Sequence, residues 1–206
     1  MSPTLYWSVR RELWENRAIY IAPVCVALLV LFGFLVSSFT LPRRMHAALA
    51  LSPVKQHEIV TMPYNFAAGM VLVTAFIVGV FYSLDALYGE RRDRSILFWK
   101  SLPVSDRTTV LAKASIPLVI LPLIVFAVVI ATQVIILLLN NAALARSRTG
   151  LALLWTHLRF FQSSIALLYS LIAITLWHAP LYAWLLLISA WAERAEIGRA
   201  SCRERV

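Results

Sequence analysis

Glycine is scarce in this chain, and its glycines are too far apart to form a phosphate-binding loop. A P-loop needs two glycines five residues apart, followed by Lys and then Ser or Thr, so that backbone N–H groups can surround a phosphate. The sequence therefore excludes ATP binding by that route. The glycines are Gly33, Gly69, Gly79, Gly89, Gly150 and Gly198.

Signatures of enzymes and metal sites are missing as well. The sequence has no His-Glu-x-x-His helix, no Gly-x-Ser-x-Gly turn and no group of Cys and His at zinc spacing. Its two cysteines, Cys25 and Cys202, imply no disulfide framework. We expect no catalytic, cofactor-binding or metal-binding residues in this chain.

Charged residues are few and apolar residues dominate. Charged residues make up 14% of the chain and apolar residues 61%, whereas a soluble domain is roughly half apolar. The net charge of +9 could indicate nucleic-acid binding, but the cations flank apolar runs, where lipid headgroups and membrane topology account for them. We expect a membrane protein that binds no nucleic acid.

Four apolar runs without charge are long enough to cross a bilayer as α-helices. We place spans at about 18–41, 64–84, 116–140 and 163–190. Pro117, Pro122 and Pro180 fall inside the last two runs, where each removes a backbone donor and tends to kink the helix. Such runs are too long for barrel strands, so the expected fold is an all-α, polytopic helical bundle.

The connection between the second and third spans is the richest in Lys and Arg. The positive-inside tendency places this connection in the cytoplasm, and the N-terminus with it. We expect a multi-pass protein of the inner (plasma) membrane of a bacterial cell. Aromatic residues near run ends, including Tyr64, Tyr82, Tyr182 and Trp177, are expected to form belts at the membrane surfaces. The cations of the connection are Arg91, Arg92, Arg94, Lys100, Arg107 and Lys113.

Residues 4–17 are expected to form an amphipathic helix that lies in the headgroup plane. Placed on a helix, the apolar and aromatic residues fall on one broad side. Glu12, Glu15 and Arg11 fall largely opposite. Arg10 and Arg17 interrupt the apolar arc, and an irregular start to the first span is the alternative.

The central connection, residues 88–113, is expected to contain a short helix, a turn and a second helix. Gly89 can end the second span, and Pro103 breaks the helical propensity that follows it. Ser105 is a suitable N-cap, and Asp106 in the first turn favours the helix dipole of a helix that runs towards Lys113.

This connection resembles that of the type-2 permeases of ATP-binding-cassette (ABC) transporters. The shared pattern is a Glu after the second span, an apolar patch, Leu-Pro-Val-Ser, and a Lys before the third span, although this chain has Arg94-Ser95 where the family usually has Gly-Thr. The residues that we assign to this ATPase-coupling loop are Glu90, Arg91, Arg92, Ile96, Leu97, Leu102, Pro103, Val104, Ser105 and Lys113.

The resemblance implies a permease subunit of an exporter that catalyses no covalent chemistry itself. In that family the connection carries the coupling helix that docks on a separate ATPase subunit, which binds ATP and Mg. The implied partners are two ABC ATPase subunits and a second permease copy, identical or related. Such permeases usually have six spans, so the full-length protein is expected to have two more.

Three polar residues within the apolar runs are candidates for a transport pathway. Gln133 and Asn140 could line such a path or bond neighbouring helices, and His178 could be functional or simply bond a carbonyl that Pro180 frees. Two other function classes remain open at this point. One is a membrane scaffold or anchor that does not transport, and the other is an intramembrane enzyme that uses His178 with Asp85.

The last stretch of the chain differs abruptly in character from the rest. Residues 196–206 are similar to one reading frame of a common sequencing adapter. We expect this segment to be non-native, which makes 1–195 an incomplete transmembrane domain.

Overall fold

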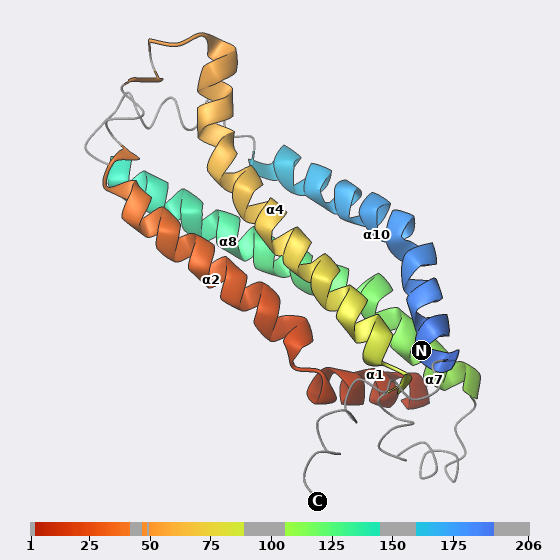
Figure 1. Ribbon diagram of the computed structural model, residues 1–206. Coiled ribbons are helices and arrows are strands. Elements are labelled where there is room, and N and C mark those ends of the chain that lie inside the picture. Colours follow the sequence, from red (N-terminus) through yellow and green to blue (C-terminus); the bar gives the residue numbers. More distant parts are fainter. Residues whose placement is uncertain (1–2, 42–46, 49, 89–105, 145–159, 192–206) are drawn as a thin grey trace, which may run out of the picture.

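The computed structural model describes residues 3–41, 47–48, 50–88, 106–144 and 160–191, and these are helical apart from short turns. The expected all-α fold is therefore confirmed. Figure 1 shows the elements. They are α1 (Pro3–Glu15), α2 (Ala18–Ser38), α4 (Pro53–Asp85), α7 (Asp106–Ser115), the π-helical turn η1 (Ile116–Ile120), α8 (Leu121–Leu144) and α10 (Phe160–Trp191).

Four helices in the described part of the chain are long and apolar enough to cross a membrane. They are Ala18–Ser38, Pro53–Asp85, Arg107–Leu144 and Phe160–Trp191. The second begins eleven residues earlier than the apolar run at 64–84, because Pro53 occupies the first turn and the polar residues after it continue the helix. The charged and polar residues before position 64 therefore mark the end of the apolar part of α4, and the helix itself extends beyond that part.

Helix α4 is the centre of the bundle. It packs against α2, α8 and α10, and α2 also packs along α8. Its buried face carries several small residues, among them Ala67, Ala68, Ala75 and Gly79, which recur at helical spacing. Small residues let helix backbones approach closely, which is how helices associate in lipid without a hydrophobic driving force.

Helix α1 and helix α7, which forms the first part of the third spanning helix, lie together at one end of the bundle. Helix α1 lies across this end (Figure 1) and packs against α7, which also packs against α10. Glu12 of α1 is bonded to Tyr82 in the last turn of α4. The end of α2, the start of α4 and the end of α8 lie at the opposite end. Consecutive spans therefore alternate in direction, as in a polytopic membrane bundle.

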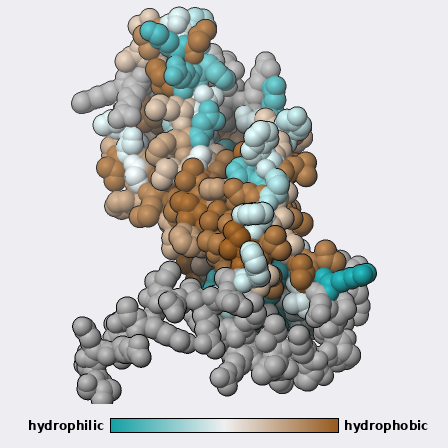
Figure 2. All heavy atoms as spheres, turned by 45° about the vertical axis from the view of Figure 1, so that its right-hand side comes forward, coloured by the Kyte–Doolittle hydropathy of each residue, from teal (hydrophilic) through white to brown (hydrophobic). Residues whose placement is uncertain are grey.

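Large apolar side chains cover the outside of the spans. Leu29, Phe32, Phe81 and Trp177 are each more than half exposed. Figure 2 shows that on one face the apolar side chains gather in the middle of the molecule. A water-soluble protein rarely exposes so much apolar surface, whereas lipid contact suits it.

Prolines shape two of the spans, as expected. Pro117 lies in η1, whose π-type turn ends with the N–H of Leu121 bonded to the carbonyl of Ile116. Pro180 lies inside α10, and the half of α10 that contains it bends away from the first half (Figure 1). Proline and π-type turns are the usual causes of such changes in a helix.

The tyrosines expected in the aromatic belts have a different location. Tyr64, Tyr82 and Tyr182 are buried inside the bundle, so their assignment to membrane-surface belts is wrong. Each sits on the face of its helix that packs against another helix, where Tyr64 and Tyr82 also find hydrogen-bond partners. Trp177, by contrast, is exposed.

Candidate functional site

Most of the predicted coupling loop lies outside the described residues, and only its last part is described. The helix expected from Asp106 towards Lys113 is present as α7, and Lys113 lies in its last turn. Glu90, Arg91, Arg92, Ile96, Leu97, Leu102, Pro103, Val104 and Ser105 lie outside the described residues.

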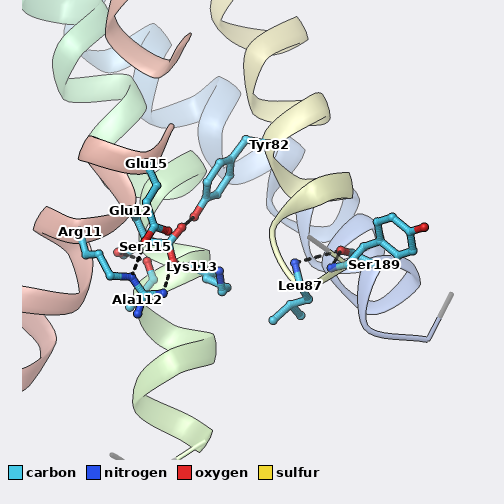
Figure 3. A network of polar contacts seen from close by, with 10 residues as sticks. Arg11, Glu12, Glu15, Tyr82, Leu87, Ala112, Lys113, Ser115 and Ser189 are labelled. Carbon is cyan, nitrogen blue, oxygen red and sulfur yellow. Dashed lines mark hydrogen bonds and ion pairs between the residues drawn. The ribbon is translucent and has the colours of Figure 1, made fainter. Parts of the chain in front are cut away.

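Lys113 is the one predicted loop residue whose contacts are described, and its ammonium is buried against α1. Its Nζ lies 2.9 Å from Oε1 of Glu12, and the two residues are only 2% and 3% exposed. The hydroxyl of Tyr82 donates to the other carboxylate oxygen, Oε2, at 2.9 Å. Each oxygen of Glu12 thus has a partner from a different helix (Figure 3).

The position of Glu12 corrects the expected amphipathic arrangement of α1. Glu12 was expected on the polar side of the helix, largely opposite the apolar residues, but it is buried together with Val9 and next to Leu13. Tyr6, Trp7 and Trp14, which belong to the predicted apolar side, are exposed on the surface of the protein. The reason is physical: Glu12 lies one helical turn after Val9 and meets a buried cation there, whereas the aromatic residues face outward.

Three helices meet at the Glu12 carboxylate. Glu12 belongs to α1, Lys113 to α7 and Tyr82 to the last turn of α4. A buried charge is tolerated only when it is paired and its remaining hydrogen-bonding capacity is used. The carboxylate therefore fixes the relative positions of α1, α4 and α7.

The other end of the central connection has its own anchor. The backbone N–H groups of Leu87 and Tyr88 donate to the hydroxyl oxygen of Ser189 at 3.1 and 3.0 Å. These groups follow the end of α4, and Ser189 lies near the end of α10 (Figure 3). The hydroxyl replaces the helical acceptors that these two N–H groups lose where α4 ends.

The connection of residues 88–113 is thus held at both ends by polar contacts with distant segments. Tyr88 at its start is bonded to α10, and Lys113 at its end is bonded to α1. A displacement of the connection would act on both helices at once. We define Glu12, Tyr82, Lys113 and Ser189, with the backbone of 87–88, as the anchor site.

Sequence reasoning found Lys113 but missed the other three anchor residues. Glu12 gave a usable signal, because it follows Val9 by three residues and therefore lies near the apolar side of the helix that carries Val9 and Leu13. Tyr82 was noticed only as a membrane-surface residue. Ser189 gave none, since a serine within an apolar run has no distinguishing pattern until its neighbours are placed.

Of the polar candidates in the third span, Asn140 bonds a neighbouring helix. Asn140 is 2% exposed, and its Nδ2 donates to the hydroxyl of Tyr64 on α4 at 2.9 Å. Gln133, on the same helix, is buried too. The Asn140 contact matches the helix-bonding alternative.

His178 lies beside a small pocket between α4, α8 and α10. Its Nδ1 is 2.7 Å from the carbonyl oxygen of Ile174 one turn earlier, and its ring lies edge-on to Phe76 at 4.9 Å between centroids. A carbonyl acceptor was expected, but the carbonyl that Pro180 frees is that of Leu176, four residues before the proline. The pocket has a volume of about 50 Å³, and Pro117, Pro122, Thr175 and Tyr182 also line it.

The structure separates His178 from Asp85. His178 contacts Phe76, and Asp85 is nine residues further along the same helix. At 1.5 Å per residue this is about 13 Å along the axis. The two side chains form no acid–base pair in this arrangement.

Below this pocket, Tyr182 packs directly on the backbone of Gly79. A Cβ built on Gly79 would lie 2.8 Å from the Tyr182 hydroxyl oxygen and 3.1 Å from two ring carbons. The absence of a side chain at Gly79 therefore leaves room for the Tyr182 ring of α10 against the α4 backbone.

Within the described residues, no group of three or more His, Cys, Asp and Glu could hold a metal ion. Comparison with known proteins adds no assignment: no family model, no curated protein and no solved structure matches this chain.

Proposed function

We propose that this chain is the membrane-spanning permease subunit of an ABC exporter, with the α1 end of the bundle in the cytoplasm of a bacterial cell. Three features support the proposal. The four apolar helices suit a bilayer, the central connection carries the pattern that resembles type-2 permeases, and its excess of Lys and Arg favours the cytoplasmic side. Without a P-loop, ATP hydrolysis has to come from a separate subunit that holds ATP and Mg.

The anchor site is the observation that carries the proposal. A coupling loop needs fixed contacts at its ends, because a loop that moved independently of the spanning helices could not displace them. Lys113 bonds Glu12 of α1 and Ser189 of α10 bonds the start of the connection. Tyr82 ties the same carboxylate to α4.

The mechanism follows from these contacts. ATP binding closes the pair of ATPase subunits and displaces the connection between residues 88 and 113. Glu12 passes this displacement to α1 and α4, and Ser189 passes it to α10. The spans then exchange an inward-open for an outward-open packing with a second permease copy. The π-type turn Ile116–Ile120, directly after α7, is a natural pivot.

The experiment begins with the source genome around this gene. A neighbouring gene for a P-loop ATPase is cloned and produced together with the complete permease, and the complex is purified in mild detergent and returned to lipid vesicles. We expect a stable complex whose ATPase activity depends on the permease. Leu97→Asp in the predicted loop should abolish the complex, because a buried carboxylate opposes docking.

A second variant separates docking from coupling. Ser189→Ala should leave the complex intact but lower the permease-dependent ATPase activity several-fold. Phe32→Leu on the exposed face of α2 is the matched control and should behave as the wild type. A stable membrane complex that contains no ATPase would overturn the permease proposal in favour of a scaffold.

A further inference from the structure

The outward face of α1 carries a stripe of aromatic residues with an arginine in its middle. Tyr6, Trp7 and Trp14 are 53%, 60% and 68% exposed. Arg10 is exposed as well and lies between the two tryptophans at helical spacing. This face is opposite the buried side that holds Val9 and Glu12.

Arg10 makes cation–π contacts with both tryptophans. Its guanidinium carbon lies 5.3 Å from the ring centroid of Trp7 and 5.0 Å from that of Trp14. A cation–π contact uses the charge of the guanidinium and not its N–H donors, so the donors of Arg10 can bind an anion at the same time. The rings also hold the guanidinium in one orientation, which lowers the entropy lost on binding.

The carboxylates of α1 do not neutralise this arginine. Glu12 is paired with Lys113, and Glu15 is paired with Arg11 at 3.2 Å. Among the ion pairs of the described part of the chain, none includes Arg10. The outward stripe is therefore apolar, aromatic and positively charged.

Chain continuity places the stripe at the level of lipid headgroups. Helix α1 ends at Glu15, and the spanning helix α2 begins at Ala18. Trp14 is thus four residues before the first residue of a membrane span, and α1 lies across the end of the bundle (Figure 1). Trp, Tyr and Arg are the side chains that favour this layer.

We propose that Trp7, Arg10 and Trp14 form a binding site for the phosphate of an anionic phospholipid in the leaflet at the α1 end of the bundle. The Arg10 guanidinium donates to the phosphate oxygens, and the two indole rings lie among the glycerol and upper acyl groups. A zwitterionic lipid offers the same phosphate, but its own cation offsets the charge. This inference goes beyond the permease function and does not rest on it.

Native mass spectrometry of the purified full chain tests the site. The detergent-solubilised protein is mixed with phosphatidylglycerol or with phosphatidylcholine, and lipid adducts are counted. We expect adducts mainly with phosphatidylglycerol, and about a tenfold loss of affinity for it in Arg10→Gln, in line with one charge-assisted contact. Arg17→Gln, at another exposed arginine of the same corner, is the matched control and should retain wild-type binding.

Two further variants keep the result decisive. Arg10→Lys keeps the charge but loses the planar, forked set of N–H donors, and we expect it to bind several-fold more weakly than the wild type. In vesicles that contain brominated phosphatidylglycerol, the wild type should lose more tryptophan fluorescence than the Trp7→Phe, Trp14→Phe double variant. Equal loss of binding in Arg10→Gln and Arg17→Gln, or equal quenching of the two proteins in vesicles, overturns the proposal.

Discussion

Lys113 of α7 and Glu12 of α1, which are 101 residues apart in the sequence, form an ion pair with 2.9 Å between Nζ and Oε1. Both side chains are buried, so neither charge is solvated by water. Burying two charges costs free energy that their attraction only partly returns, which makes such a pair weak evidence for stability in itself. What the pair does determine is position: α7 can dock on α1 in only one register.

Removing one member of this pair should destabilise the fold strongly. Glu12→Gln removes the carboxylate charge that the buried Lys113 ammonium contacts at 2.9 Å, and breaking a buried pair in this way costs about 3–5 kcal/mol. The measurement is the free energy of unfolding when sodium dodecyl sulfate is added to the protein in mild detergent.

The double variant Glu12→Gln, Lys113→Met distinguishes charge from shape. It removes both charges and should recover most of the free energy of unfolding that Glu12→Gln loses. The matched control is Glu15→Gln, whose carboxylate is about half exposed in its pair with Arg11 and should change stability by less than about 1 kcal/mol. A double variant as unstable as Glu12→Gln would contradict the pairing.

The contact of Gly79 with Tyr182 predicts a strong dependence on side-chain size. Gly79→Ala places a Cβ 2.8 Å from the Tyr182 hydroxyl oxygen, so the Tyr182 side chain or α10 itself has to shift. We expect a loss of about 1–3 kcal/mol, as for other overpacked interiors. The measurement is the same detergent unfolding.

Gly69 on the same helix is the matched control, because nothing lies within 4 Å of a Cβ built on it. Gly69→Ala should leave stability unchanged or raise it slightly. When Tyr182 is replaced by Leu, Gly79→Ala should lose most of its effect. An equal effect of Gly79→Ala with and without Tyr182 would disprove the close approach.

The main features of the fold were predictable from sequence because charge and length decide them. Runs without charge predicted the four spanning helices, and the helix expected from Asp106 towards Lys113 is present as α7. These signals are local: each depends on residues within one or two helical turns. The helical extension from Pro53 before the second run was missed, since a helix does not stop where polarity begins.

The anchor site was largely unpredictable because it depends on contacts between distant segments. Glu12 was assigned to the polar side of its helix, and contacts with Lys113 and Tyr82 make its burial tolerable. Tyr82 was assigned to a membrane surface because it lies near the end of an apolar run, and its hydrogen bond to Glu12 could not be foreseen from that position. Ser189 has a role only because the end of α4 lies beside it.

The hydrogen bonds to Ser189 predict that its loss changes hydrogen exchange at the end of α4 and has little effect on the rest of the fold. Ser189→Ala removes the acceptor for the N–H groups of Leu87 and Tyr88, and each unsatisfied group costs about 1–3 kcal/mol until the segment opens to water. We expect amide hydrogen exchange at these two residues to accelerate about tenfold or more. Exchange in the middle of α4 should stay as in the wild type.

Ser164→Ala is the matched control for this measurement. Ser164 is on the same helix α10, but its hydroxyl bonds the carbonyl of Phe160 in its own helix at 2.9 Å. Exchange at Leu87 and Tyr88 should therefore be unchanged in Ser164→Ala. Faster exchange at these residues in both variants would mean that α10 loosens as a whole, and the specific anchor at Ser189 would be refuted.

At the opposite end of the bundle, Asn140 and Tyr64 should show energetic coupling. The Asn140 amide donates to the Tyr64 hydroxyl, and its buried Oδ1 has no hydrogen-bond partner in the described structure. Tyr64→Phe would remove the acceptor of the Asn140 amide, whose Oδ1 already lacks a hydrogen-bond partner. Asn140→Leu would remove the donor to the Tyr64 hydroxyl. A double-mutant cycle of the two, followed by detergent unfolding, should give a coupling of about 0.6–1.7 kcal/mol, the range for hydrogen bonds between membrane helices.

The control cycle pairs Tyr64→Phe with Thr74→Val. The Thr74 hydroxyl donates to the carbonyl of Met70 in its own helix at 2.9 Å, so the two changes should be additive. Additivity in both cycles would mean that the Asn140 contact does not join α8 to α4, and that Asn140 is free to serve a different role in the bundle.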